Sequence, residues 1–173
     1  MKNLILLLFL TVSLTASGQH ETNLHIATDA KVLIFGSDNQ YTQHKGVGNI
    51  VVMLESIDYT AGKWYPGGYL GFRYVNLPQK FNHAFAGLNM AFEIARYFYA
   101  LPGIEGGLVW RERSTDGAEI MGNVAFAAVL DLRYNLRPWL ALSFRPNVET
   151  AKDLPDRNFR YQATVGAVIR NLF

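Results

Sequence analysis

The sequence predicts an all-β chain whose strands close into an antiparallel up-and-down transmembrane β-barrel of about eight strands. Three observations predict this class. Apolar and polar residues alternate with a period of two along most of the chain. Beyond the N-terminal segment, no apolar run approaches the ~18 residues that a membrane-spanning helix requires. The connections between the alternating segments are short and long in turn, which is typical of barrels that cross membranes.

The N-terminal segment has the features of a secretory signal peptide. Lys2 supplies a positive charge, and Leu4 to Leu10 is an uninterrupted apolar stretch too short to span a bilayer. Small residues follow, which predicts cleavage near Gly18-Gln19. We therefore expect residues 1–18 to be the signal peptide and residues 19–173 to be the barrel domain of an exported protein.

The segment Ala84–Ala95 shows the strand period most clearly. Its even-numbered residues are wholly apolar, whereas its odd-numbered residues include Gly87, Asn89 and Glu93. A helix would place Glu93 beside Asn89 on an apolar stripe. The same alternation predicts strands over the approximate ranges 24–37, 46–58, 68–77, 83–95, 99–112, 118–134, 138–147 and 158–173. Because lipid offers no hydrogen-bond partner to an unpaired strand edge, such strands can span a membrane only as a closed barrel.

The lengths of the connections between these strands distinguish the two rims of the predicted barrel. Residues 95–98 and 134–138 are short joins, whereas residues 77–82 and 146–158 are longer and polar. Short turns at one rim and longer loops at the other are the pattern of outer-membrane barrels. The join at residues 59–68 departs from it, because it is long for the short-turn rim.

Aromatic residues gather near the short connections. The predicted interfacial aromatics are Tyr97, Phe98, Tyr99, Tyr134, Trp139 and Phe173. They would share one rim with Tyr59, Trp64 and Tyr65. Amphipathic rings favour the headgroup level of a bilayer, so we interpret this group as an interfacial belt. Ordinary core aromatics would explain their number but not their position at strand ends.

The other face of the predicted strands carries charge. Its charged residues are Arg73, Glu93, Glu105, Arg111, Asp131, Arg133, Arg145, Arg160 and Arg170. Glu55 is a further candidate acid. Because an unpaired charge is costly inside lipid-surrounded walls, we expect these residues to pair within the lumen. Eight strands leave an interior only wide enough for side chains, which favours a polar plug over a conducting path for ions or small solutes.

The chain ends as a strand. The final segment, YQATVGAVIRNLF, alternates up to Phe173. It resembles the closing strand of the outer-membrane β-barrel family, and the segments FEIARYFY and LRYNLRPWLALSFRP resemble hairpins of the small OmpA/OmpX-type barrels of Gram-negative bacteria. The resemblance implies an eight-stranded barrel in outer-membrane lipid with its loops facing outward. It also implies that the terminal Phe173 takes part in the signal for the barrel-assembly machinery. It carries over no functional residue.

The composition narrows the function classes. Charged residues make up 17% of the chain, against ~25% in an average soluble domain. The formal net charge of +2 is too small to neutralise many phosphates, so we expect no nucleic-acid partner. The chain has no cysteine, and it shows no nucleotide-binding loop or metal-ligand cluster. We therefore expect no metal, no cofactor and no catalytic residue.

Four functions stay open at this point. The leading hypothesis is a non-enzymatic barrel with a structural role or an extracellular partner for its loops, of which residues 146–158, including Glu149, are the best docking candidate. The second is a narrow channel. The third is a lipid A-modifying acyl hydrolase or transferase that uses Ser37, Asp38 and His44, although nothing in their spacing brings base and nucleophile together. The fourth is a soluble lipocalin-like barrel with an apolar pocket.

Overall fold

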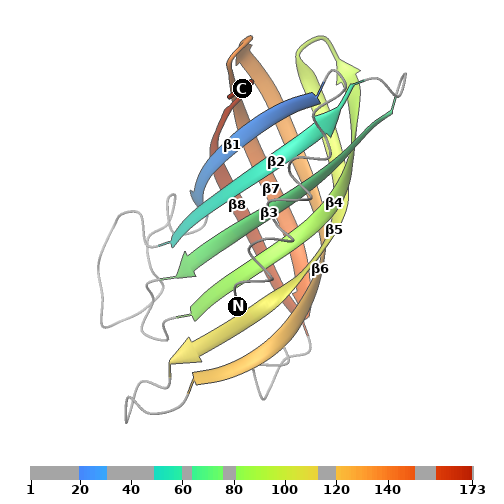
Figure 1. Ribbon diagram of the computed structural model, residues 1–173. Coiled ribbons are helices and arrows are strands. Elements are labelled where there is room, and N and C mark those ends of the chain that lie inside the picture. The colour runs from blue at the N-terminus through green and yellow to red at the C-terminus, as the bar shows by residue number, and fades with distance from the viewer. Residues whose placement is uncertain are drawn as a thin grey trace.

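The computed structural model of the chain is a closed barrel of eight antiparallel strands (Figure 1). The strands are β1 His20–Asp29, β2 Asn49–Asp58, β3 Tyr65–Val75, β4 Phe81–Ala95, β5 Phe98–Glu112, β6 Ile120–Arg137, β7 Leu140–Thr150 and β8 Phe159–Ile169. Each strand pairs with its neighbours in the sequence, and β1 pairs with β8 to close the barrel. The structure describes residues 20–30, 49–59, 64–75, 81–112, 120–150 and 159–172. The predicted up-and-down barrel is therefore confirmed.

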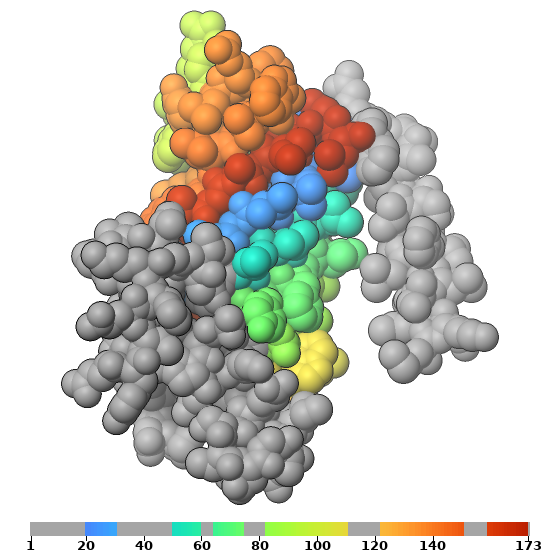
Figure 2. All heavy atoms as spheres, turned by 90° about the vertical axis from the view of Figure 1, so that its left-hand side faces the viewer, coloured from blue at the N-terminus to red at the C-terminus, as the bar shows by residue number. Residues whose placement is uncertain are grey.

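The closing seam is the shortest of the strand interfaces. Six residue pairs join β1 to β8, from Leu24–Ile169 to Asp29–Thr164. Fifteen pairs join β5 to β6, from Phe98–Tyr134 to Glu112–Ile120. Figure 2 shows the seam, where β8 (red) lies beside β1 (blue). Because every strand has two neighbours in this order, the described strands form a cylinder with no free side along the seam.

Side chains alternate between the outside and the inside of the cylinder. In β7, Ala141, Ser143, Arg145 and Asn147 are buried, whereas Leu142 and Phe144 are exposed. In β6, Asp131 and Arg133 are buried while Leu130 is exposed. The barrel thus has an apolar exterior and a polar interior, which is the reverse of a soluble protein. Among the described residues, no helix is long and apolar enough to cross a membrane.

Several strands begin or end a few residues from their predicted positions, and β7 ends at Thr150 and β8 at Ile169 rather than near residues 147 and 173. The first strand was predicted at residues 24–37 but occupies His20–Asp29. Its inward residues Glu21, Asn23 and His25 are polar. The start of this strand therefore resembles a polar N-terminal extension in composition, although its side chains alternate as in a strand. β3 begins at Tyr65 rather than near residue 68. The connection between β2 and β3, predicted at residues 59–68, is therefore shorter than predicted.

The short turns lie at one rim of the barrel. The β4–β5 turn contains Arg96 and Tyr97, and the β6–β7 turn contains Pro138 and Trp139. The chain end after β8 reaches this same rim (Figure 1), where the amide of Arg170 donates to the carbonyl of Trp139 at 2.9 Å. We call this the short-turn rim. The opposite rim carries the longer connections, and we call it the loop rim.

Candidate functional site

The first candidate site is a group of buried polar side chains in the half of the lumen nearer the short-turn rim. We call this group the Glu55 cluster, and its members are Asn23, His25, Glu55, Asn89, Asp131, Arg133 and Ser143. They come from β1, β2, β4, β6 and β7. The cluster therefore ties opposite walls of the barrel together across its interior.

Arg133 is the centre of the Glu55 cluster. Its Nη1 donates to Glu55 Oε2 at 2.6 Å and its Nη2 to Glu55 Oε1 at 2.8 Å. Its Nε and Nη2 also donate to Asp131 Oδ2 at 2.9 and 2.7 Å. The planar guanidinium thus bridges two carboxylates, a geometry that the compact ammonium of lysine cannot reproduce. Each carboxylate also accepts a hydrogen bond from an uncharged side chain. Asn89 donates to Glu55 at 2.6 Å, and Ser143 donates to Asp131 at 2.6 Å.

A second group of charged side chains fills the half of the lumen nearer the loop rim. We call it the Glu149 cluster, and its members are Tyr69, Arg73, His83, Glu105, Arg145, Glu149, Arg160 and Gln162. Arg145 Nη2 donates to Glu105 Oε2 at 2.7 Å. Arg73 Nη1 donates to Glu149 Oε2 at 3.2 Å, and Arg160 Nη2 donates to Glu149 Oε1 at 3.3 Å. Glu149 is completely buried, so two cations neutralise a carboxylate that water cannot reach.

Two cations of the Glu149 cluster lie against aromatic rings. The Arg145 guanidinium lies 4.6 Å from the Tyr69 ring centroid, and the Arg73 guanidinium lies 5.6 Å from that of Phe85. Gly87 leaves room for Tyr69, because a Cβ at this position would overlap the Tyr69 ring. These contacts place the Tyr69 hydroxyl 3.3 Å from Glu105 Oε2, to which it donates.

A third ion pair lies at the short-turn rim of the lumen. Arg170 donates from Nε and Nη2 to the two carboxylate oxygens of Glu21 at 2.5 and 2.6 Å. These parallel hydrogen bonds raise the pKa of the Arg170 guanidinium. The pair joins the first strand to the chain end, beside the closing seam.

The ion pairs described above contain equal numbers of arginines and acids. Five arginines stand inside the barrel, and they are Arg73, Arg133, Arg145, Arg160 and Arg170. Five acids face them, and they are Glu21, Glu55, Glu105, Asp131 and Glu149. Each of these arginines therefore has an acidic partner within the lumen. A balanced set of paired charges is what a lumen surrounded by lipid requires.

The space between the two clusters is closed. Met53, Tyr69, Leu101 and Arg145 line the gap between them, and it has no room for a water molecule. Arg145 Nη1 also approaches Met53 Sδ at 2.9 Å. Nearer the short-turn rim, the cavity beside Tyr99 and Arg170 is about the size of one water molecule. Side chains therefore fill the lumen between the two clusters.

The structure places most of the predicted lumen residues inside the barrel. Five of them are buried, namely Arg73, Glu105, Asp131, Arg133 and Arg145. Arg160 and Arg170 are half-buried and join the ion pairs described above. Glu93 belongs to neither cluster, and its predicted place in the network is wrong. It is exposed at the end of β4, where the register with β5 shifts between Glu93 and Ala95. Arg111 belongs to β5, and its side chain lies outside the described part of the chain.

Sequence reasoning missed several lumen residues. Glu21, Asn23, His25, His83 and Glu149 are buried. Glu149 was predicted in an outer loop, but it lies in β7, which continues to Thr150. The signal was present, because the alternation of β7 continues without a break through Asn147 and Glu149. The remaining docking-loop residues, 151–158, lie outside the described residues.

The predicted aromatic belt divides into two groups. Tyr97, Tyr134 and Trp139 are exposed at the short-turn rim, and Phe98 is half-buried. Tyr99 instead packs with Tyr59 and Tyr65 against the buried Ile57, Ala91 and Leu101, so its assignment to the belt is wrong. It pairs with Glu93 before the register shift and shares the inward face of β5 with Leu101. Phe173 lies outside the described residues, as do Ser37, Asp38 and His44.

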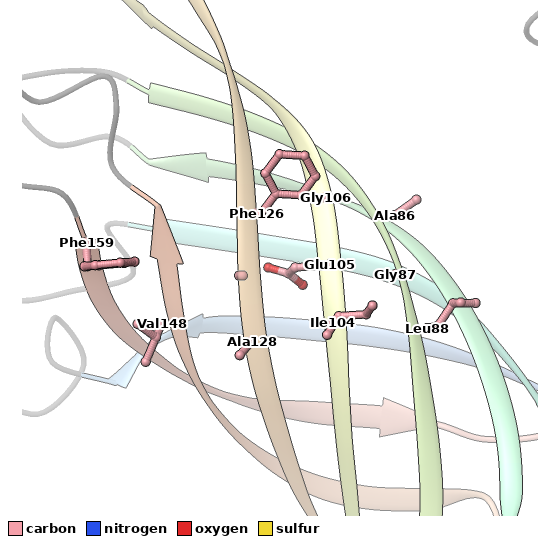
Figure 3. Close-up of a pocket in the computed structure, with 11 residues that line it drawn as sticks. Ala86, Gly87, Leu88, Ile104, Glu105, Gly106, Phe126, Ala128, Val148 and Phe159 are labelled. Atoms are coloured by element: carbon pink, nitrogen blue, oxygen red, sulfur yellow. The ribbon is translucent and has the colours of Figure 1, made fainter.

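A shallow apolar groove crosses the outside of the barrel wall (Figure 3). Its volume is about 610 Å³. The small residues Ala86, Gly106 and Ala128 form its floor, between larger side chains that include Leu88, Ile104, Phe126, Val148 and Phe159. Glu105 also borders the groove, but its carboxylate binds Arg145 inside the lumen. Within the described ranges, no group of three or more His, Asp or Glu side chains is arranged to hold a metal ion.

Two solved structures of one outer-membrane protein have a fold similar to that of this chain. The chain is similar to the outer membrane protein Ail of Yersinia pestis in a phospholipid bilayer nanodisc, with a TM-score of 0.59 and 12% identity over 89% of this chain and 99% of that one. It is also similar to the crystal structure of Ail, with a TM-score of 0.52 and 14% identity over 88% and 98% of the two chains. No family model and no curated protein matches the sequence. The chain therefore has the fold of the small eight-stranded outer-membrane β-barrels.

Proposed function

We propose that this protein is a non-enzymatic, integral outer-membrane β-barrel whose lumen is closed by an internal ion-pair network. One observation carries the proposal, namely the inside-out distribution of side chains. Leu88 and Phe126 are 64% and 63% exposed, whereas Glu55 and Glu149 are 2% and 0% exposed. In water this arrangement would expose a continuous apolar surface, but in lipid the same surface is solvated by acyl chains.

The strand lengths support insertion into a bilayer. The shortest described strands, β1 and β2, have 10 residues each, and β6 has 18. A tilted strand needs about 9–11 residues to cross the hydrocarbon core. The shared fold with Ail, itself an outer membrane protein, supports the same location for this chain.

The closed lumen favours a structural role over transport. Every described lumen cation contacts a carboxylate, and the gap between the two clusters has no room for water. An ion that crossed the barrel would have to separate these pairs in a medium of low dielectric constant. We therefore assign the work of the protein to its outer surface and its loops, which would meet an extracellular partner at the loop rim.

The two ends of the chain would serve export and assembly. Residues 1–18 would direct export and be removed, and Phe173 would be read by the barrel-assembly machinery. Deletion of Phe173 should then reduce the amount of folded protein in the outer membrane without reducing export. Equal amounts of folded protein from the two chains in fractionated cells would contradict this role of Phe173.

The experiment that tests the proposed function combines gel mobility with conductance. The unheated protein, purified in detergent, should migrate differently from the heated protein, because a closed hydrogen-bonded barrel resists detergent. In planar bilayers the wild-type protein should show no stepwise conductance. Solubility without detergent together with unchanged mobility would favour the lipocalin-like alternative. Stepwise conductance altered by Arg133→Ala would favour the channel.

A further inference from the structure

A basic and aromatic surface lies at the short-turn rim, outside the lumen. It consists of Arg96, Tyr97, Arg137 and Trp139, and we call it the rim cluster. All four side chains are exposed, with Tyr97 at 48% and Trp139 at 59%. The plug described above uses none of them, and an aromatic belt alone does not explain the two arginines.

The β4–β5 turn holds Arg96 in a defined place. Tyr97 has a φ of 70°, a left-handed conformation that is uncommon for a bulky residue and is worth a functional explanation. The carbonyl of Tyr97 accepts a hydrogen bond of 2.8 Å from the amide of Asn135, which ties the turn to β6. In this conformation the Arg96 guanidinium lies 5.0 Å from the centroid of the Tyr97 ring. The cation is therefore positioned before any ligand arrives.

The β6–β7 hairpin brings the backbone of a second arginine, Arg137, near the β4–β5 turn. Arg137 follows Asn135 by two residues, so its backbone lies within roughly 7 Å of the point where the two turns are joined. The register between β6 and β7 shifts between Asn135 and Arg137, as the β4–β5 register shifts before Arg96. Such irregularities re-aim side chains at the rims of barrels. Arg96 is followed directly by the exposed Tyr97, whereas Arg137 is followed by Pro138 and then by the exposed Trp139.

The arginines of the rim cluster have no carboxylate partner within the described ranges. Among the described residues, neither Arg96 nor Arg137 makes an ion pair with a carboxylate. The nearby Glu93 pairs in register with the inward-packing Tyr99, and Glu21 is engaged by Arg170. The rim cluster therefore presents two guanidinium groups to the surroundings of the barrel.

We propose that the rim cluster binds the phosphate of an anionic phospholipid headgroup. This inference rests on the proposed membrane location, which puts the end of the apolar wall at the headgroup level. A guanidinium offers parallel donors that match phosphate geometry, and Tyr97 and Trp139 are the ring types that favour this level. The outward-facing Tyr134 extends the aromatic surface toward the acyl chains.

The test measures contact between lipid and the rim cluster through the fluorescence of Trp139. In a W64F/W110F background, Trp139 is the only tryptophan of the chain. The full chain is folded into phosphatidylcholine vesicles that contain either brominated phosphatidylglycerol or brominated phosphatidylcholine at the same mole fraction. Brominated phosphatidylglycerol should quench Trp139 more strongly, and R96Q/R137Q should abolish the difference. The preference is the ratio of Trp139 quenching by brominated phosphatidylglycerol to quenching by brominated phosphatidylcholine. This ratio should fall by up to roughly fivefold for each arginine removed, as expected for a basic residue near an anionic surface.

A matched control separates local binding from net charge. K45Q/K80Q removes the same charge from the connections at the loop rim and should leave the Trp139 preference unchanged. Equal quenching by the two lipids, or a preference that survives R96Q/R137Q, would overturn the proposal. A chain that does not enter vesicles at all would instead refute the proposed function. Mass spectrometry of wild-type and R96Q/R137Q protein released from mixed nanodiscs measures the same lipid ratio without the tryptophan substitutions.

Discussion

The two charged clusters of the lumen differ in how completely their polar atoms are paired. In the Glu55 cluster, all four carboxylate oxygens of Glu55 and Asp131 accept hydrogen bonds of 3.1 Å or less, and the buried atoms without a partner in the described part of the chain are the amide oxygens of Asn23 and Asn89. In the Glu149 cluster, Arg73 Nε, Glu105 Oε1 and both ring nitrogens of His83 are buried with no hydrogen-bond partner among the described residues. His83 Nδ1 comes within 3.5 Å of Glu149 Oε1 without forming a hydrogen bond.

This difference assigns different roles to the two halves of the lumen. A network whose charged groups are all paired is rigid and costly to break in a medium of low dielectric constant. A network with unpaired buried atoms gains less from its contacts and is the natural place for bound water. The Glu55 cluster is therefore the stabilising half of the plug, and the Glu149 cluster is the half that tolerates change.

The largest expected effect comes from breaking the Glu55 cluster. Arg133→Ala removes the cation that bridges Glu55 and Asp131 and leaves two buried carboxylates facing each other. We expect the free energy of unfolding to fall by about 3–5 kcal/mol, the cost of removing one partner from a buried ion pair. Urea unfolding of the protein in lipid vesicles, followed by tryptophan fluorescence, measures this loss. A loss below about 1 kcal/mol would mean that the cluster stabilises no more than a surface ion pair does.

The second-largest effect is expected when a charge is placed on the outer wall of the barrel. Leu130 is exposed and immediately precedes the buried Asp131 on β6. Leu130→Arg should destabilise the barrel by about 2–4 kcal/mol if the residue lies near the bilayer midplane. The same urea experiment measures it, with Leu130→Ala as the control for lost volume. A neutral result for Leu130→Arg would place this face in water.

A smaller effect is expected from the Glu149 cluster. Arg73→Met removes one of the two cations on Glu149, but Arg160 still contacts that carboxylate and Arg145 still contacts Glu105. We expect a loss of about 1–3 kcal/mol, the cost of leaving buried hydrogen-bonding groups unsatisfied. A side-by-side comparison with Arg133→Ala in the same vesicles ranks the two clusters. If Arg73→Met cost more than Arg133→Ala, the assignment of the stabilising half would be reversed.

The smallest effect is expected where a polar atom is added to the lumen. Ala127 is buried on the inward face of β6 and pairs in register with Glu149. Ala127→Ser should change the free energy of unfolding by no more than about 0.5 kcal/mol, because the added hydroxyl group finds polar neighbours there. A large destabilisation would show that the loop-side lumen is packed as tightly as the Glu55 cluster.

Local alternation was sufficient to predict the face of most strand residues, and it failed where strands end. Asp131 and Arg133 were placed correctly on one face of β6, because side chains of a strand must alternate. Glu93 was misplaced because it lies at the end of β4, beyond both clusters, where it is exposed although it pairs in register with the inward-packing Tyr99. Tyr99 was misplaced because an aromatic residue at a strand end fits the mouth of the lumen as well as the membrane interface. Glu149 was missed because a polar strand end has the composition of a loop.

The sequence by itself determined the barrel class, the approximate number of strands and the charged character of the lumen, because all three follow from a period of two and the balance of residue types along each strand. Only the tertiary structure decided which charges meet. Arg133 and Glu55 are 78 positions apart, and Arg170 and Glu21 are 149 apart. These pairs form because closure of the cylinder brings β2 opposite β6 and the chain end beside β1. Their partners depend on the stagger of the closed sheet, which no local pattern encodes.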